Sequence, residues 1–198
     1  MTGEAPLAPE VLDLLQRAAA WRLLGLLFER PRPGWQEELE SLAKTVAEDT
    51  ELSAAVEAAR TEAREGLYHT ILAPGGPASP RETSHRPWVL PGQILAELNA
   101  FYEAFVYLPK TEEPADHISV EAGFMGYLFL KQAYALEQGQ EERAQVAAEA
   151  AQRFAQDHLA EIAEPLAVSI EPLGVRYLAL ASEALLLRTG PKPPSPGI

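Results

Sequence analysis

The segment ISVEAGFMGYLFLKQAYAL, from Ile118 to Leu136, decides the fold class of this chain. One stripe of apolar residues at helical spacing includes Met125 and Phe129, and other apolar residues occupy the remaining faces. A helix that is apolar on every side is a buried helix. We therefore expect this segment to be the central helix of an all-α domain.

The start of this helix is polar. Asp116 is well placed as the N-cap, whose carboxylate accepts hydrogen bonds from the amides of the first turn. His117 and Glu121 are four residues apart and so share one face. An ordinary cap and a surface pair would explain these residues. A recognition point would explain them too, because the carboxylates of Asp116 and Glu121 suit a guanidinium group on a partner.

Helical periodicity also dominates outside the central segment, and strand-like alternation is nearly absent. No repeat of fixed period is present, so the sequence predicts a single-domain irregular helical bundle of about seven helices over residues 1–190. The proline-rich tail, residues 191–198, is expected to be disordered. The expected helices run from Pro9 to about residue 30, then over 35–48, 49–72, 93–107, 117–138, 141–163 and 172–190.

Several residues carry more specific expectations. Gly66 is a weak point inside the third expected helix, and Pro165 is expected to stop the sixth. The loop over residues 74–91 is rich in proline and glycine. Within it, the apolar residues Trp88, Val89 and Leu90 suggest that part of the loop packs against the bundle. His158 lies on an apolar stripe with Phe154, which favours a hydrogen-bonded core histidine.

Composition excludes several classes of function. The chain has 16 basic and 29 acidic residues, a net charge of −13, which opposes a nucleic-acid binder or a protein that docks on anionic membranes. The absence of cysteine excludes disulfides and thiolate metal sites. No secretory signal or membrane-spanning segment is visible, so we expect a cytoplasmic protein.

Two other readings of the residues stay open. A helical carboxylate-bridged metal enzyme would need two Glu-x-x-His pairs, whereas this chain has one, Glu82 to His85, in the proline-rich loop. An acidic adaptor domain is the second alternative, although no basic recognition helix supports contact with DNA. No glycine-rich phosphate loop is present either.

The segment PADHISVEAGFMGYL, residues 114–128, resembles the P-D-H-I-x-x-E-L-x-F-M-x-x-L motif of the TorD/DmsD/NarJ superfamily. Three further blocks are similar to that family's motifs and occur in the same order: YHTIL at 68–72, PRETS at 80–84 and FAQDHL at 154–159. The resemblance extends over roughly residues 10–188. The motif residues are most similar to those of chaperones of type II DMSO-reductase-like enzymes. Leu72 and Gly123 depart from the family's usual residues, which leaves the client open.

The resemblance implies an all-helical cytoplasmic chaperone and no enzyme activity. Such a protein binds the N-terminal leader, commonly a twin-arginine signal, and the apo form of a molybdenum-containing oxidoreductase. It assists cofactor insertion before export or membrane assembly. The molybdenum cofactor belongs to the client, so the chaperone itself is expected to hold no cofactor and no metal. A monomer and a domain-swapped homodimer are both open, with residues 74–91 or 109–115 as hinges.

The resemblance also suggests which residues contact the leader. Asp116 and His117 are the first candidates, and Glu121 and Glu82 are carboxylates that suit its arginines. Tyr68, Leu72 and Trp88 are expected to line an apolar groove for its apolar stretch.

Overall fold

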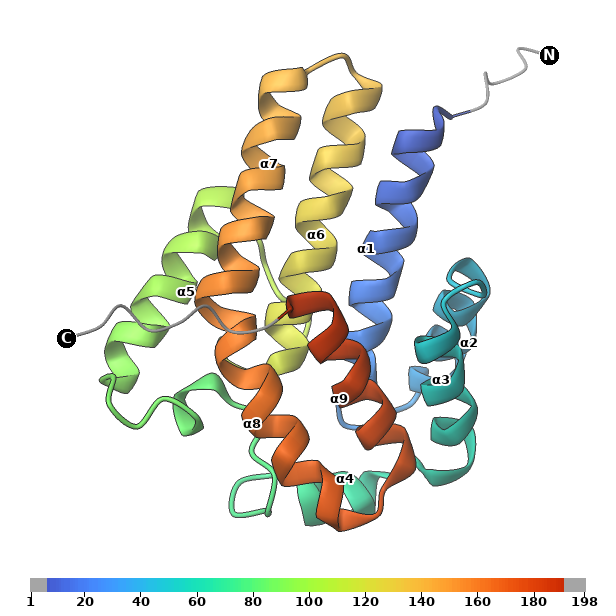
Figure 1. Cartoon of the computed structure of the whole chain (residues 1–198), viewed down its shortest axis with the longest axis vertical. Helices are drawn as coiled ribbons and strands as arrows, with labels where there is room; N and C mark the ends of the chain where they lie inside the picture. The colour runs from blue at the N-terminus through green and yellow to red at the C-terminus, as the bar shows by residue number, and fades with distance from the viewer. Residues whose placement is uncertain (1–6, 191–198) are drawn as a thin grey trace.

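The computed structural model describes residues 7–190, and in that range the chain is helical and forms no β-strand (Figure 1). The all-α prediction is therefore confirmed. The expected tail at 191–198 lies outside the described residues. The helices are α1 (Pro9–Leu27), α2 (Trp35–Thr45), α3 (Thr50–Glu62), α4 (Glu65–Ile71), α5 (Pro91–Phe105), α6 (Ile118–Glu137), α7 (Glu141–Phe154), α8 (Ala160–Ile170) and α9 (Arg176–Thr189).

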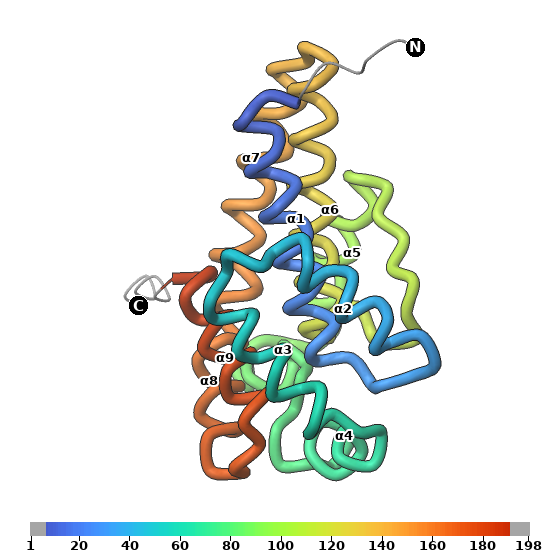
Figure 2. The backbone as a smooth tube through the Cα atoms, turned by 90° about the vertical axis from the view of Figure 1, so that its right-hand side faces the viewer, coloured from blue at the N-terminus to red at the C-terminus, as the bar shows by residue number. Residues whose placement is uncertain are grey.

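The central position of α6 is also confirmed. It lies between α1 and α7, which flank it along most of its length (Figures 1 and 2). Two glycines allow α1 and α6 to pack closely. A Cβ atom at Gly126 would lie 2.9 Å from the carbonyl oxygen of Ala18, and one at Gly25 would lie 3.0 Å from that of Ser119. The two helix backbones can approach this closely because neither glycine has a side chain.

The third expected helix is broken into α3 and α4, so a continuous helix over 49–72 was wrong. The break falls at Ala63 and Arg64, both in extended conformation, and Gly66 lies inside α4. The Glu62 carboxylate at the end of α3 accepts a hydrogen bond of 3.0 Å from the backbone amide of Tyr177 in the first turn of α9. Local helix propensity does not explain the end of α3 at this position. We attribute it to the packing of α3 against α9.

Pro165 does not stop the sixth helix, contrary to the expectation. The chain passes from α7 through a wide π turn, Ala155–Leu159, into α8, which contains Pro165 and continues to Ile170. An internal proline costs a helix about 3 kcal/mol. Ile162, Leu166 and Ile170 on this helix are buried in the main core, and we attribute the continuation of α8 to their burial.

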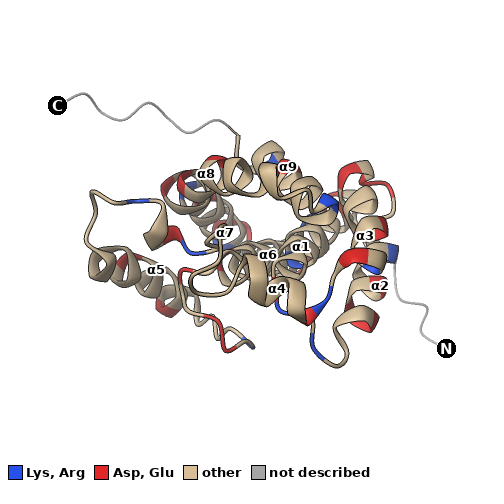
Figure 3. Cartoon of the chain, turned by 90° about the horizontal axis from the view of Figure 1, so that it is seen from below, with Lys and Arg blue, Asp and Glu red and all other residues tan. Residues whose placement is uncertain are grey.

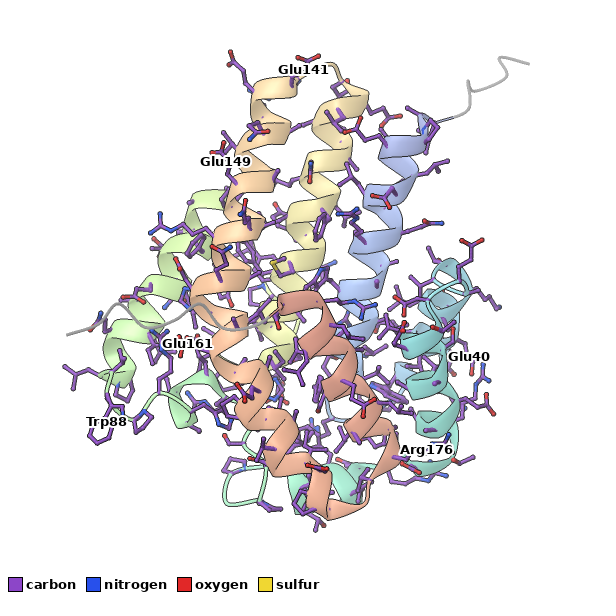
Figure 4. The ribbon with its side chains drawn as sticks, viewed as in Figure 1. Glu40, Trp88, Glu141, Glu149, Glu161 and Arg176 are labelled. Carbon is purple, nitrogen blue, oxygen red and sulfur yellow. The ribbon has the colours of Figure 1, made fainter. Side chains whose placement is uncertain are left out.

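The prediction that part of the loop between α4 and α5 packs against the bundle is confirmed for Val89 and not for Trp88. Trp88 is 96% exposed and points away from the bundle (Figure 4), although the neighbouring Val89 packs against the core. Two backbone hydrogen bonds join the same loop to the residues before α6, and a short 3-10 turn, Glu82–Ser84, follows. Within residues 7–190, no helix combines the length and apolar character needed to cross a membrane.

Candidate functional site

A short antiparallel bridge brings two distant parts of the sequence together at the start of α6. The amide of Glu82 donates to the carbonyl of Asp116 at 2.9 Å, and the amide of Ile118 donates to the carbonyl of Pro80 at 2.8 Å. Residues 80–83 therefore lie beside residues 116–118. This bridge places three of the predicted site residues, Glu82, Asp116 and His117, at one junction.

The Asp116 carboxylate is fully buried and accepts hydrogen bonds from two residues across this junction. The Arg81 guanidinium donates to Oδ1 from Nε at 2.9 Å and from Nη2 at 2.7 Å, and the Thr83 hydroxyl donates to Oδ2 at 2.6 Å. Burial alone would raise the pKa of Asp116, but these hydrogen bonds outweigh burial and hold the pKa below its ordinary value. Asp116 is thus a buried anion that already has a guanidinium partner.

Asp116 is not the N-cap of α6, which corrects the sequence prediction. The cap is His117, whose Nδ1 accepts a hydrogen bond of 3.1 Å from the amide of Ser119. Burial lowers the pKa of His117 to about 4, so the imidazole is neutral at physiological pH and can accept this bond. The carboxylate of Asp116 instead faces Arg81 and Thr83. Their hydrogen bonds stabilise its buried charge.

Glu82 is held by a second arginine and by a histidine. Its carboxylate accepts a hydrogen bond from Arg86 and lies 3.0 Å from Nδ1 of His158. The Arg86 guanidinium also donates to the carbonyl of Asp157 at 3.4 Å and lies 3.9 Å from a carboxylate oxygen of Glu161. His158 is buried, so the prediction of a hydrogen-bonded core histidine is confirmed.

Glu121 lies one turn into α6 and is fully buried. Among residues 7–190, neither of its carboxylate oxygens has a hydrogen-bond partner. Burial, followed by the nearby negative charges of Glu82 and Asp116, raises the pKa of Glu121 well above its ordinary value. Burial and these negative charges therefore both favour the protonated form of the Glu121 carboxyl. The alternative that His117 and Glu121 form a surface pair is excluded, since both side chains are buried and His117 contacts Ser119 instead.

The predicted groove residues are separated. The hydroxyl of Tyr68 donates to Glu113 at 2.9 Å and lies 3.5 Å from Nε2 of His117, on the wall of a pocket of about 710 Å³. Leu72 is buried in the core, so it does not line this pocket, and neither does the exposed Trp88. Of the predicted residues, only Tyr68 lines this pocket, together with Glu113, which was not predicted.

Sequence reasoning missed a second hollow that adjoins this pocket. It has a volume of about 660 Å³ and lies between α1, α6 and the connection from α5, with the exposed apolar residues Val106 and Leu108 on its wall. Both pockets are bordered by Glu29, Arg32, Lys110 and Thr111. Tyr107 covers Gly123 of α6, where a Cβ atom would lie 2.6 Å from the Tyr107 hydroxyl. The glycine at position 123, unusual for the motif, was the signal that could have indicated this hollow.

The residues for the alternative metal site do not converge. The His85 Nε2 lies 2.7 Å from the carbonyl of Ser79, while Glu82 faces Arg86 and His158. Among residues 7–190, no three His, Asp or Glu side chains are grouped as ligands for one ion.

Comparisons with known proteins agree with this architecture. The sequence matches the family described as the nitrate reductase delta subunit over residues 29–167, which is most of the chain. The fold is similar to the crystal structure of a candidate redox enzyme maturation protein from Archaeoglobus fulgidus. That match has a TM-score of 0.54 and 17% identity, and it covers 87% of this chain and 94% of the other. No curated protein matches the sequence significantly. The match over residues 29–167 shows that this chain belongs to the nitrate reductase delta subunit family.

Proposed function

We propose that this protein is a cytoplasmic chaperone for the maturation of a molybdenum-containing oxidoreductase. In this role it binds the N-terminal leader and the apo form of the client and assists cofactor insertion before export or membrane assembly. It acts by binding and performs no catalysis of its own. The family match and the shared fold with the Archaeoglobus fulgidus protein support this class of function.

One observation carries the proposal further than the family match. The four sequence blocks that resemble the chaperone motifs are up to about 90 residues apart, yet side chains from all four meet at one junction. Tyr68 lies beside His117, Arg81 pairs with Asp116, and Glu82 contacts His158. Each contact joins two different blocks. Residues that share one junction in the fold are expected to serve one task there.

The open pocket beside this junction is the proposed place for the leader. Glu113 on its wall retains a partly exposed carboxylate, and the adjoining hollow presents Val106 and Leu108 to an apolar stretch. Acidic residues are spread over α2, α3, α5 and α8 (Figure 3), and the net charge is −13. Such a field attracts a cationic leader and raises the association rate most strongly at low salt.

Co-purification from the native host, with identification of the bound protein, tests the class of function. We expect the precursor of a molybdenum enzyme. Repeated recovery of the chain alone, or with nucleic acid, would contradict the proposal.

A second experiment tests the pocket, using a synthetic peptide with the N-terminal residues of the recovered enzyme. Glu113→Gln should weaken peptide binding by about tenfold, the effect of losing one hydrogen bond to a charged group. Glu149→Gln removes the same charge from the exposed face of α7 and is the matched control (Figure 4). Equal affinities for the two variants would remove Glu113 from the site.

A further inference from the structure

We propose that Asp116 and Thr83 form a receptor site for a guanidinium group of the client leader, and that Arg81 occupies this site in the free protein as an internal substitute ligand. The inference rests on the proposed function for the identity of the leader. The guanidinium site itself is argued from the contacts of this chain and is testable without a client.

The geometry of the site is that of arginine recognition. Arg81 directs Nε and Nη2 at one oxygen of the carboxylate, Oδ1, and Nε also lies 3.2 Å from Oδ2. Thr83 donates to Oδ2 from its hydroxyl and, at 3.3 Å, from its backbone amide. Thr83 thus holds Oδ2 of Asp116, while Oδ1 faces two N–H groups of one planar guanidinium, a group whose several fixed donors suit a carboxylate.

The solvent lies on the far side of this guanidinium. The Asp116 side chain is 0% exposed, whereas the Arg81 side chain is 39% exposed. Arg81 therefore covers the carboxylate, and a guanidinium that arrives from solution reaches Asp116 where Arg81 now lies.

Within residues 7–190, the guanidinium of Arg81 forms hydrogen bonds only with Asp116, so its departure breaks no other side-chain hydrogen bond. Among residues 7–190, Asp116 is its only ion-pair partner. The bridge between residues 80–82 and 116–118 is made by backbone atoms, so the site keeps its shape when the Arg81 side chain moves. Exchange of one guanidinium for another also keeps the buried carboxylate paired, which avoids the cost of an uncompensated buried charge.

An internal competitor lowers the apparent affinity of an external ligand in proportion to the time it occupies the site. Removing the Arg81 guanidinium should therefore strengthen leader binding. With a synthetic leader peptide of the co-purified enzyme, we expect Arg81→Gln to bind about three- to tenfold more tightly than the wild type. This gain should disappear in Arg81→Gln combined with Asp116→Asn.

Loss of one positive charge from an acidic protein would by itself favour a cationic peptide. Arg153→Gln controls for this effect, because Arg153 is an exposed arginine that pairs with Asp157 outside the junction. An Arg81→Gln affinity equal to that of Arg153→Gln, or weaker than that of the wild type, would overturn the role of Arg81 as a competitor.

The guanidinium site can be tested without any client by chemical rescue. Methylguanidinium at millimolar concentration should raise the Tm of Arg81→Ala more than that of the wild type or of Arg153→Ala, because it fills the vacated site. Methylammonium, which has the charge but not the planar fork, should have a smaller effect. Equal effects of the two ions would overturn the site. If Arg81→Ala does not fold, Arg81→Gln also vacates the guanidinium position and serves for the same measurement.

Rescue by methylguanidinium together with no peptide binding by the wild type would contradict the proposed function and leave the guanidinium site intact. Peptide binding by the wild type together with no rescue would contradict this inference alone.

Discussion

Two arginine–carboxylate pairs have their arginines in the same loop and differ in how far the arginine is exposed to solvent. Arg81 pairs with Asp116, and its side chain is 39% exposed. Arg86 pairs with Glu82, and its side chain is 18% exposed and lies beside Asp157 and Glu161. Both carboxylates are fully buried. The same two chemical groups, a guanidinium and a carboxylate, thus form a purely structural contact where the arginine has several partners. They form an exchangeable contact where the arginine has one partner.

We expect the largest effect on stability from the loss of the Arg86–Glu82 pair. Glu82→Ala leaves Arg86 and His158 without their common partner and should lower the free energy of unfolding by about 3–5 kcal/mol. Urea denaturation measures this, with Glu164→Ala on the exposed side of α8 as the control. A loss below about 1 kcal/mol would mean that the Arg86–Glu82 pair does not stabilise the fold as proposed.

The Arg81–Asp116 pair should contribute less to the free energy of unfolding. Asp116→Asn keeps the shape of the side chain but removes its charge, and should lower the free energy of unfolding by about 1–3 kcal/mol. The pKa of Asp116 is lower in the folded state, so its contribution is present above the unfolded value of 3.8 and is lost as pH falls through the folded pKa. Unfolding curves between pH 7 and pH 2 should therefore converge for wild type and variant at the acid end. A constant difference would contradict the charge argument.

The two arginines give the most direct comparison. Arg81→Gln should cost about 1 kcal/mol or less, because water can reach the carboxylate that the guanidinium leaves. Arg86→Gln should cost more, since Glu82 would remain buried without its cation. Equal losses in the two variants would remove the distinction between the pairs.

At Glu121, the third carboxylate of the junction, we expect a substitution to increase stability. Burial and two neighbouring negative charges raise the pKa of Glu121, so the folded state binds a proton that the unfolded state releases above about pH 4.5. Stability from this group is complete below that pH and decreases as pH rises. Glu121→Gln should thus be about as stable as the wild type at pH 4 and more stable than the wild type at pH 8. A variant less stable at pH 8 would indicate that the carboxylate has an anionic role.

The fold followed from local pattern more closely than the site did. The helix behind Asp116 was predictable because its all-round apolar surface can be satisfied only by burial. The break at Ala63 and the continuation of α8 through Pro165 were not predictable, because the packing of other helices overrides local propensity at both places. The exposure of Trp88 was missed for the same reason, since nothing in a run of apolar residues tells which of them meets the core.

The sequence by itself determined that the chain is a helical bundle, that α6 is its centre and which motif residues belong to one family. Periodicity and composition are local properties, and burial of an apolar helix needs no particular partner. Only the tertiary structure decided the state of each charged residue. Asp116 is paired with Arg81, and burial together with the charge of Glu82 raises the pKa of Glu121, although Arg81 and Glu82 are more than 30 positions away from these carboxylates in the sequence. Coulomb interaction and desolvation depend on distance in space, which spacing along the chain does not contain.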